Sequence, residues 1–375
     1  MKITAVTTYP LRRKLSRRLC PAPGFFDNRS SLIVKLETDA GICGWGETGL
    51  FPGACALIEE QYAPILIGSD PTAHRLLWRQ LWGPNFGNGP ALGAVDIALE
   101  DLRGKAMGVP VAELYGGRLR DRVAIYASTL GFLEGEDARV QYPRQAEEFA
   151  AAGFRAIKLK IGAQTIEEDL AAVAAARQAV GPGMKIMADA NGAYSLGEAI
   201  RVGRELEQLG LYWFEEPLPQ ESTEYAAYEQ LAAALDIPIA AGEVLSSRGL
   251  FKELITRRAI DIVQPDICLA GGIGECLFIA EMARLWGMAC MPHACVGGVV
   301  IAMSAHLVSL LPDASWSRTT EPPMVEVDVT ENPFRDDILV TPLKISDGCI
   351  QVPTAPGLGV EIDEDKLAFY ADGPS

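Results

Sequence analysis

The sequence predicts an α/β fold, a (β/α)7β barrel of the TIM type with an N-terminal α+β capping domain that the C-terminal segment completes. From about residue 121, short β-rich apolar runs alternate with helix-like segments, with a repeat of roughly 25 to 30 residues. A further strand-like stretch follows residue 314, which makes the last strand of such a barrel. No GxGxxG motif follows a first strand, and this disfavours an open dinucleotide-binding sheet.

The predicted capping domain spans residues 1–120 and lacks the strand–helix alternation. An antiparallel meander is expected in "ITAVTTYPLR", "SSLIVKLETDAG" and "CGWGE". Helices are expected in "LWRQLWG" and "ALGAVDIALEDLRGKAMG".

The predicted barrel spans residues 121–325, with parallel strands joined by helical crossovers. Several of its helices end at Gly or shortly before Pro. Its first seven strands are expected in "RVAIYAS", "FRAIKLKIG", "KIMADAN", "LYWFEEP", "IPIAAGE", "IDIVQPD" and "MACMPHA". The segment 326–375 has short strands and turns rich in Pro and Gly, and we expect it to pack back on the capping domain.

Composition limits the class of protein. A chain of 375 residues fits one large domain with a smaller one. The formal net charge of −16 argues against nucleic acid as a partner. No apolar run reaches the roughly 18 to 20 residues of a membrane helix, and the first residues do not resemble a signal peptide. The eight cysteines lack CxxC or zinc-finger spacing, so we expect reduced thiols in a cytoplasmic protein.

Charged side chains gather where the predicted strands end. Barrels of this kind place functional residues at the C-terminal ends of their strands. A lone acid at such a position more often caps a helix or meets solvent, but here successive strands all end in charged or polar residues. They are Lys158, Lys160, Asp189, Asn191, Glu215, Glu243, Asp266 and His293.

Three of these acids point to a metal site. Asp189, Glu215 and Glu243 lie one strand–helix unit apart, and adjacent strands are about 4.8 Å apart, so their carboxylates converge. Three carboxylates in one cleft repel each other unless their pKa values rise or a cation lies among them. Oxygen ligands with open positions favour Mg²⁺, with Mn²⁺ as the alternative ion.

Lys158 and Lys160 lie on the same face of their strand. One possibility is that they only pair with the acids. The other is that a lysine beside a cation and a second ammonium loses its proton easily and acts as a general base. Its neighbour would then stay charged and bind a substrate carboxylate.

His293 forms the other half of the predicted site. It is one of three histidines, and Asp266 on the preceding strand can hold its imidazole in one tautomer. This pair lies across the barrel mouth from the lysines, so a substrate would lie between the two. His74 and His306 fall outside these strand ends, and we expect structural roles for them.

The motifs together resemble the enolase superfamily, in particular its mandelate racemase subgroup. "KLK", "DAN", "FEEP", "AGE", "QPD" followed by "GG", and "PH" match in order and spacing across essentially the whole chain. The region "PDICLAGG" lacks the second lysine of muconate-lactonising relatives, which disfavours that subgroup. The resemblance implies these roles: Lys160 as acid/base, Lys158 on the substrate carboxylate, His293 with Asp266 as second acid/base, Glu326 hydrogen-bonded to the enolate, and Asp189, Glu215 and Glu243 as Mg²⁺ ligands.

The resemblance also implies abstraction of the proton α to a carboxylate, through an enediolate that the metal stabilises. The segments "EPPMVEVDVTENPFRDDIL" and "VQPDICLAGGIGE" resemble members that act on sugar acids, including galactarolactone and anhydrogalactonate cycloisomerases. We expect a cycloisomerase, with an acid-sugar dehydratase almost level and a 2-hydroxy-acid racemase behind. The alternative outside enzymes is an inactive barrel scaffold.

Two predicted loops in the capping domain, "RRLCPAPGFFDNRSS" and "TGLFPGA", are candidates for substrate specificity. Arg17, Arg18 and Asn28 would bind a hydroxylated, anionic small molecule together with Asn191, although the three loop residues could equally face solvent. The size of the chain and its acidic surface are compatible with a symmetric homo-oligomer, which we expect.

Overall fold

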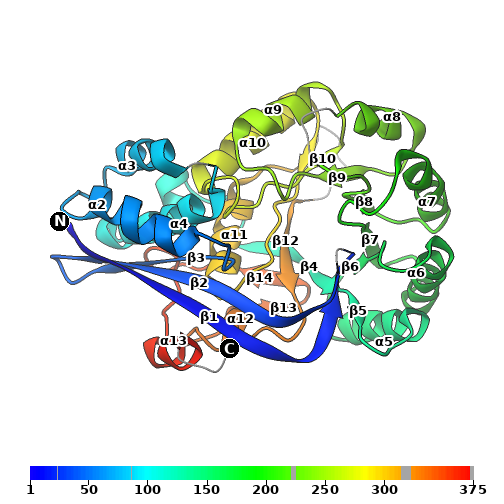
Figure 1. Cartoon of the computed structure of the whole chain (residues 1–375), viewed down its shortest axis with the longest axis horizontal. Coiled ribbons are helices and arrows are strands. Elements are labelled where there is room, and N and C mark those ends of the chain that lie inside the picture. The colour runs from blue at the N-terminus through cyan, green and yellow to red at the C-terminus, as the bar shows by residue number, and fades with distance from the viewer. Residues whose placement is uncertain (23, 86, 221–224, 314–321, 372–375) are drawn as a thin grey trace.

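The computed structural model describes residues 1–22, 24–85, 87–220, 225–313 and 322–371. An antiparallel sheet with its helices forms one side of the molecule, and a parallel sheet surrounded by helices forms the other (Figure 1). Within these residues, no helix combines the length and the apolar character needed to cross a membrane. All eight cysteines are free thiols, as the sequence indicated.

The antiparallel sheet confirms the predicted meander. β1 (Ile3–Cys20), β2 (Phe26–Thr38) and β3 (Cys43–Thr48) pair in the order β3-β2-β1. The hairpin is longer than expected, because β1 continues through the basic stretch "LRRKLSRRL". β5 (Phe132–Leu133) pairs with β1 only at Leu19 and Cys20, so the rest of that edge of β1 has no strand beside it in the described chain.

Helices cover one face of this sheet. They are α1 (Ala54–Leu57), the π-helical turn η1 (Ile58–Tyr62), α2 (Ala63–Leu66), α3 (His74–Trp82), the 3₁₀ turns η2 (Gly83–Asn85) and η3 (Val111–Tyr115), and α4 (Gly89–Met107). α4 lies directly on β3, where a Cβ at Gly46 would come within 1.9 Å of the Ala94 carbonyl oxygen. This close packing places β3 between the helices and the barrel.

The second sheet has ten strands in the described chain, and eight of them run parallel in the order β12-β4-β6-β7-β8-β9-β10-β11. No ladder joins β11 to β12 in the described chain, although the Met324 amide lies 3.4 Å from the Met291 Sδ. The strands are β4 (Arg122–Leu130), β6 (Ala156–Lys160), β7 (Lys185–Asp189), β8 (Trp213–Glu215), β9 (Ile239–Ala241), β10 (Ile262–Val263), β11 (Ala289–Cys290) and β12 (Met324–Asp328).

A helix follows each of the first seven strands, as the sequence repeat predicted, and Figure 1 shows these helices around the outside of the sheet. α6 and α7 each begin with a capping box, Thr165 with Glu168 and Ser195 with Glu198. The helices are α5 (Ala138–Ala151), α6 (Ile166–Val180), α7 (Leu196–Gln208), α8 (Ala226–Ala234), α9 (Arg248–Thr256), α10 (Ile273–Leu285) and α11 (Gly298–Leu310).

The C-terminal segment contacts both sheets. It contains α12 (Pro333–Asp336), β13 (Ile345–Ser346), β14 (Cys349–Gln351) and α13 (Glu364–Ala371). β14 pairs antiparallel with β4, and Glu364 of α13 accepts hydrogen bonds from Lys35 of β2 at 2.8 and 2.9 Å. β12 runs across the predicted division at residue 325, and the three predicted domain ranges stay predictions.

Candidate active site

The parallel register brings the predicted acids together. Lys160 of β6 stands beside Asp189 of β7, and Asp189 stands beside Glu215 of β8. Glu243 follows the end of β9. One carboxylate oxygen from each of the three acids lies within 4.8 Å of the other two. The strand ends therefore form a compact cluster of carboxylates, as the sequence predicted.

The backbone bends sharply after two of these strands. Asn191 and Glu216 adopt left-handed conformations, with φ of 43° and 41°, which cost about 1 to 3 kcal/mol each and cluster at functional sites. The Asn191 side chain lies inside the cluster, because its Oδ1 accepts from Lys160 Nζ at 2.9 Å and its Nδ2 lies 3.5 Å from Glu243 Oε1. Asn191 is thus brought to the site.

The oxygens of the cluster fit a hard divalent cation. Glu243 Oε2 is buried and has no hydrogen-bond partner among the described residues. Burial raises the pKa of Glu215 to about 7, against the opposing effect of Lys158 and with a further rise from Asp189. An all-oxygen donor set with a buried oxygen that accepts no hydrogen bond suits a divalent cation such as Mg²⁺.

Glu215 is held in one orientation. Its Oε2 accepts from the indole Nε1 of Trp213 and from Nε2 of Gln264, both at 2.8 Å. Its Oε1 accepts from Lys158. Trp213 and Gln264 were missed by the sequence reasoning, although Gln264 belongs to the "QPD" motif and Trp213 lies on the same strand face as Glu215.

Both lysines pair with acids of the cluster. Lys158 is fully buried, and its Nζ contacts Glu215 and lies 2.9 Å from Glu326 Oε1. Lys160 contacts Asp189, and 10% of its side chain is exposed. Burial lowers the pKa of Lys160, but Asp189, Glu243 and Glu215 together raise it more, so the net pKa is raised. The carboxylates of the cluster thus outweigh both burial and the repulsion between the two ammonium groups.

His293 and Asp266 form the predicted pair. The Nδ1 of His293 lies 2.7 Å from Asp266 Oδ2, while its Nε2 lies 3.3 Å from Glu243 Oε2. Burial lowers the pKa of His293, but Glu243 and Glu326 raise it well above its usual value. Its side chain is 13% exposed. Lys160 and His293 therefore both reach the surface of the site, one beside Asp189 and the other beside Glu243.

Glu326 is buried between Lys158 and His293, with its carboxylate oxygens 2.9 Å from Lys158 Nζ and 3.9 Å from His293 Nε2. It accepts hydrogen bonds from the Tyr126 hydroxyl at 3.0 Å, the Ala294 amide at 3.2 Å and the Ser128 hydroxyl. Burial raises the pKa of Glu326, but Lys158 and then His293 lower it more, so the carboxylate stays ionised. An ionised Glu326 accepts hydrogen bonds, and its predicted hydrogen bond to an enolate requires that it first take up a proton. Tyr126 and Ser128 were also missed from the sequence.

The three substrate-binding residues predicted in the capping domain make their polar contacts outside the carboxylate cluster. Arg17 pairs with Glu136, Arg18 pairs with Glu134 at 2.8 Å, and both arginine side chains are 48% exposed. Asn28 is exposed and donates to Asp27. None of their hydrogen bonds or ion pairs within the described chain reaches the carboxylate cluster. Pro23, in the same predicted loop, lies outside the described residues.

Arg29 takes a more buried position than the other basic residues of the hairpin. Its guanidinium lies 2.7 Å from Asp328 Oδ2, which is two residues beyond Glu326 on β12. Only 11% of the Arg29 side chain is exposed. The hairpin therefore reaches the end of a barrel strand through Arg29.

The other two histidines lie outside the site. His74 Nε2 lies 2.6 Å from Asp96 Oδ1 and 3.1 Å from Glu100 Oε1, and Arg103 also pairs with Glu100. His306 is buried against the Leu358 carbonyl oxygen at 3.1 Å. These contacts agree with the structural roles that the sequence indicated.

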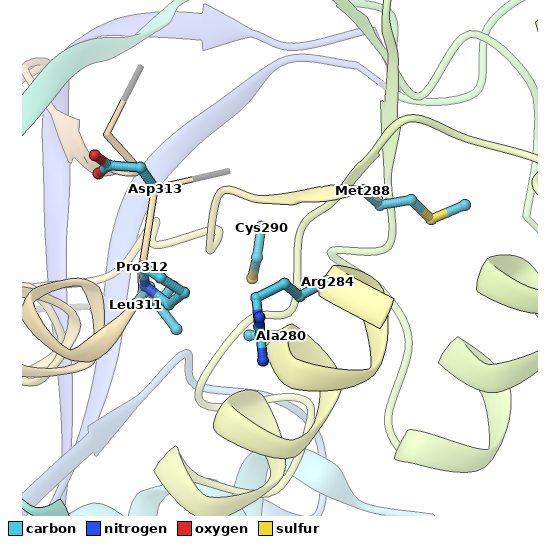
Figure 2. A pocket seen from close by; sticks show the side chains of 7 residues that line it. All are labelled: Ala280, Arg284, Met288, Cys290, Leu311, Pro312 and Asp313. Carbon is cyan, nitrogen blue, oxygen red and sulfur yellow. The ribbon is translucent and has the colours of Figure 1, made fainter. Parts of the chain in front are cut away.

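Two cavities outside the cluster add nothing to it. Figure 2 shows side chains that line the first cavity, among them Ala280, Cys290 and Leu311. This cavity has a volume of about 20 Å³, and no residue of the carboxylate cluster lines it. A larger one, of about 310 Å³, lies between the hairpin and α5, with Arg17 and Phe149 in its wall.

Comparison with known proteins gives matches along nearly the whole chain. The family model "Mandelate racemase / muconate lactonizing enzyme, N-terminal domain" matches residues 6–116, and "Enolase C-terminal domain-like" matches residues 141–366. A D-galactarolactone cycloisomerase of Agrobacterium fabrum is 38% identical over 99% of both chains. An arabinonate dehydratase of Saccharolobus solfataricus is 32% identical over 92% of this chain and 95% of its own. The crystal structure of the 3,6-anhydro-D-galactonate cycloisomerase from Zobellia galactanivorans superposes with a TM-score of 0.88, with 34% identity and full coverage of both chains.

Proposed function

Because this chain belongs to the mandelate racemase / muconate lactonizing enzyme family of the enolase superfamily, we propose that it removes the proton α to the carboxylate of a sugar acid, or of its lactone or anhydro form, and completes a cycloisomerisation. The chain is an enzyme of isomerase or lyase type, and its relatives act on sugar acids. This sets aside the inactive scaffold.

The observation that carries the proposal is the placement of two proton carriers on opposite sides of one carboxylate cluster. Lys160 contacts Asp189 at one side, and His293 Nε2 lies 3.3 Å from Glu243 at the other. If Asp189, Glu215 and Glu243 hold a divalent cation, a substrate carboxylate bound to that cation would place its α-carbon between the two proton carriers. One carrier takes the α-proton, and the other delivers a proton to the opposite face or to the leaving oxygen.

Asp189, Glu215 and Glu243 would hold one Mg²⁺, with Mn²⁺ as the alternative. When bound, the cation supplies positive charge that stabilises the developing enediolate and offsets the carboxylates that keep Lys160 protonated. Asp266 holds the His293 imidazole through Nδ1, so Nε2 faces the substrate. Lys158 is fully buried beside Glu326, and we propose that its positive charge stabilises the substrate carboxylate.

Cycloisomerisation is preferred to dehydration because the D-galactarolactone cycloisomerase shares 38% identity with this chain, against 32% for the arabinonate dehydratase and 33–34% for several D-galactonate dehydratases. In cycloisomerisation the enediolate expels a β-linked ring oxygen, whereas in dehydration it expels a β-hydroxyl as water. The dehydratase is the second candidate, favoured by those relatives, and a racemase is third.

The test is a substrate panel followed by NMR in D₂O with Mg²⁺. The panel contains D-galactarolactone, 3,6-anhydro-D-galactonate, D-galactonate and arabinonate. A cycloisomerase converts one of the first two to a 2-keto-3-deoxy acid without net loss of water and places solvent deuterium at the former β-carbon, because the α-carbon becomes the ketone carbon. A 2-keto-3-deoxy acid from D-galactonate or arabinonate would instead establish the dehydratase, and no turnover or exchange with any of the four would contradict the proposal.

We also propose that the eight parallel strands close into a (β/α)7β barrel, with boundaries near residues 120 and 325. Two contacts support closure, the Met324 amide near Met291 and the Ala294 amide on Glu326, because both bridge β12 and the chain after β11.

We further propose a cytoplasmic homo-oligomer that binds neither nucleic acid nor membranes, on the strength of the net charge of −16 and the free cysteines.

A further inference from the structure

We propose that Glu47, in the capping domain, is a positioning residue for the His293–Asp266 pair, so that the capping domain controls one of the two proton carriers and leaves the other to the barrel. The inference rests on the proposed function for the role of His293. It gives the "GWGE" segment of β3 a part in the reaction. The sequence does not reveal this part, because the segment is far along the chain from the ends of the barrel strands.

The Glu47 carboxylate holds the beginning of a barrel helix. Glu47 is fully buried, and its Oε1 accepts from the Ser31 hydroxyl at 2.8 Å. Its Oε2 accepts from the Val300 amide at 3.0 Å, in the first turn of α11. The first amides of a helix have no partner within the helix and favour an anion. α11 begins five residues after His293, so this contact fixes the far end of the His293 loop.

The fit around this carboxylate leaves no spare room. A Cβ added at Gly297 would lie 2.1 Å from Glu47 Oε1, and one at Gly298 would lie 2.4 Å from the Arg335 carbonyl oxygen. The start of α11 is therefore pressed between Glu47 and the segment after β12. A shift of the carboxylate is passed directly to the loop that carries His293.

Glu47 also reaches the loop that carries Asp266. Its backbone carbonyl oxygen lies 3.4 Å from the Cys268 thiol, which donates to it. The Cys268 amide in turn donates to Asp266 Oδ1 at 2.6 Å. Gly93 of α4 presses on the same loop, since a Cβ there would lie 2.0 Å from the Cys268 carbonyl oxygen. One capping-domain residue thus contacts the segments behind both members of the pair.

Lys160 is held in a different way. Its carbonyl oxygen accepts from the Tyr142 hydroxyl at 2.6 Å, and its Nζ contacts Asp189 and Asn191. The amide of the nearby Gly162 donates to Asp169 of α6 at 2.7 Å. All of these partners belong to the barrel. A change at Glu47 should therefore disturb His293 and spare Lys160.

The first test needs no substrate. The chain has three histidines, so protein labelled with ¹⁵N-histidine gives three sets of ring signals, and that of His293 is assigned from its absence in His293→Asn. In Glu47→Gln, which keeps the volume but removes the negative charge at the first amides of α11, we expect the His293 Nδ1 proton to exchange with solvent at least tenfold faster. The His74 and His306 signals should not move. Ser31→Ala should give a smaller change in the same direction.

The matched control is Glu37→Gln, a change of the same chemistry on the exposed part of β2. It should leave all three histidines unchanged. The proposal is overturned if folded Glu47→Gln keeps the His293 signal of the parent, or if all three histidines change together, which would indicate general loosening. Should Glu47→Gln not fold, Ser31→Ala alone decides by the same criteria.

A second readout uses a substrate from the panel that shows α-proton exchange. In a Lys160→Ala background the remaining exchange depends on His293, and in a His293→Asn background it depends on Lys160. Glu47→Gln should lower the first at least tenfold and the second less than twofold, and equal losses would contradict the proposal. If no substrate exchanges at all, the proposed function fails while the histidine signals still decide the role of Glu47.

Discussion

Glu215 illustrates how a single buried residue of the site is prepared for a metal. Trp213 and Gln264 donate hydrogen bonds to its Oε2. Its Oε1, which accepts from Lys158, is therefore the oxygen that could bind a cation instead. Partners behind a ligand commonly account for 10- to 100-fold in metal affinity, because they fix its orientation. The orientation of Glu215 is thus decided by two neighbours that do not themselves reach the metal position.

Removal of one of these neighbours should weaken metal binding. We expect Gln264→Leu to raise the dissociation constant for Mg²⁺ by about 10- to 100-fold, measured by titration calorimetry on metal-free protein. Gln230→Leu, on the exposed surface of α8, is the control and should leave the constant unchanged. A change of less than twofold in Gln264→Leu would show that Trp213 suffices.

Each proton carrier should be needed for turnover. Lys160→Ala and His293→Asn should each lower kcat by about 10²- to 10⁴-fold, the usual contribution of a positioned acid or base. Lys252→Ala, with its side chain 63% exposed on α9, should keep full activity. The variant that loses more of the α-deuterium exchange lacks the base, while the one that retains more exchange without forming product lacks the acid. Full activity in either variant would remove that residue from the mechanism.

At the scale of the secondary-structure elements, the strand ends were predictable and the packing between elements was not. Asp189, Glu215 and Glu243 follow from a regular strand–helix repeat, since each strand delivers one side chain to the same end of the sheet. Lys158 was recognised as part of the site, but its complete burial against Glu215 and Glu326 depends on β12, which joins the sheet from far along the chain.

The contribution of the capping domain was the least accessible from sequence. The extent of the β1–β2 hairpin depends on pairing between strands. Arg17 and Arg18 precede the two residues of β1 that pair with β5, and they contact Glu136 and Glu134. The role of Glu47 depends on which barrel helix the capping sheet meets. No local pattern carries that information, because the partners are separated by about as many residues as a whole domain contains.

Asp169 of α6 ties together the loops after β6 and β7. Its Oδ2 accepts from the Gly162 amide at 2.7 Å and from the Tyr194 hydroxyl at 3.1 Å, and burial raises its pKa to about 6. A raised pKa in the folded state means that its contribution to stability is present below its usual pKa of 3.8 and is lost as the pH rises through 6.

Asp169→Asn keeps an acceptor oxygen and removes this loss. We therefore expect the unfolding free energy of the variant, relative to the parent, to rise between pH 4 and pH 7 by about 2 kcal/mol. Urea unfolding at a series of pH values measures this difference. A difference that stays constant with pH would mean that Asp169 titrates as it does in the unfolded chain.

At the scale of the whole molecule, metal binding should increase the free energy of unfolding. A ligand that binds only the folded chain adds about 2.7 kcal/mol at 100 times its dissociation constant. We expect Mg²⁺ to raise the Tm and EDTA to lower it and abolish turnover. Asp189→Asn should lose the effect of Mg²⁺ on the Tm, while Asp236→Asn, exposed beyond α8, should retain it. Full activity in EDTA would contradict the metal site.

The free edge of β1 bears on how the protein behaves in concentrated solution. Unpaired backbone groups along a strand edge invite a strand from another molecule, and basic side chains are a common protection. Arg12, Arg13 and Lys14 are exposed on this strand; they pair with β2 on one edge, and no strand lies along the other edge there in the described chain. Near the isoelectric point of about 4.7 the overall charge vanishes, yet two such edges still meet with cation against cation. We expect light scattering to show no aggregation at that pH. Aggregation should appear when Arg12, Arg13 and Lys14 are all replaced by threonine.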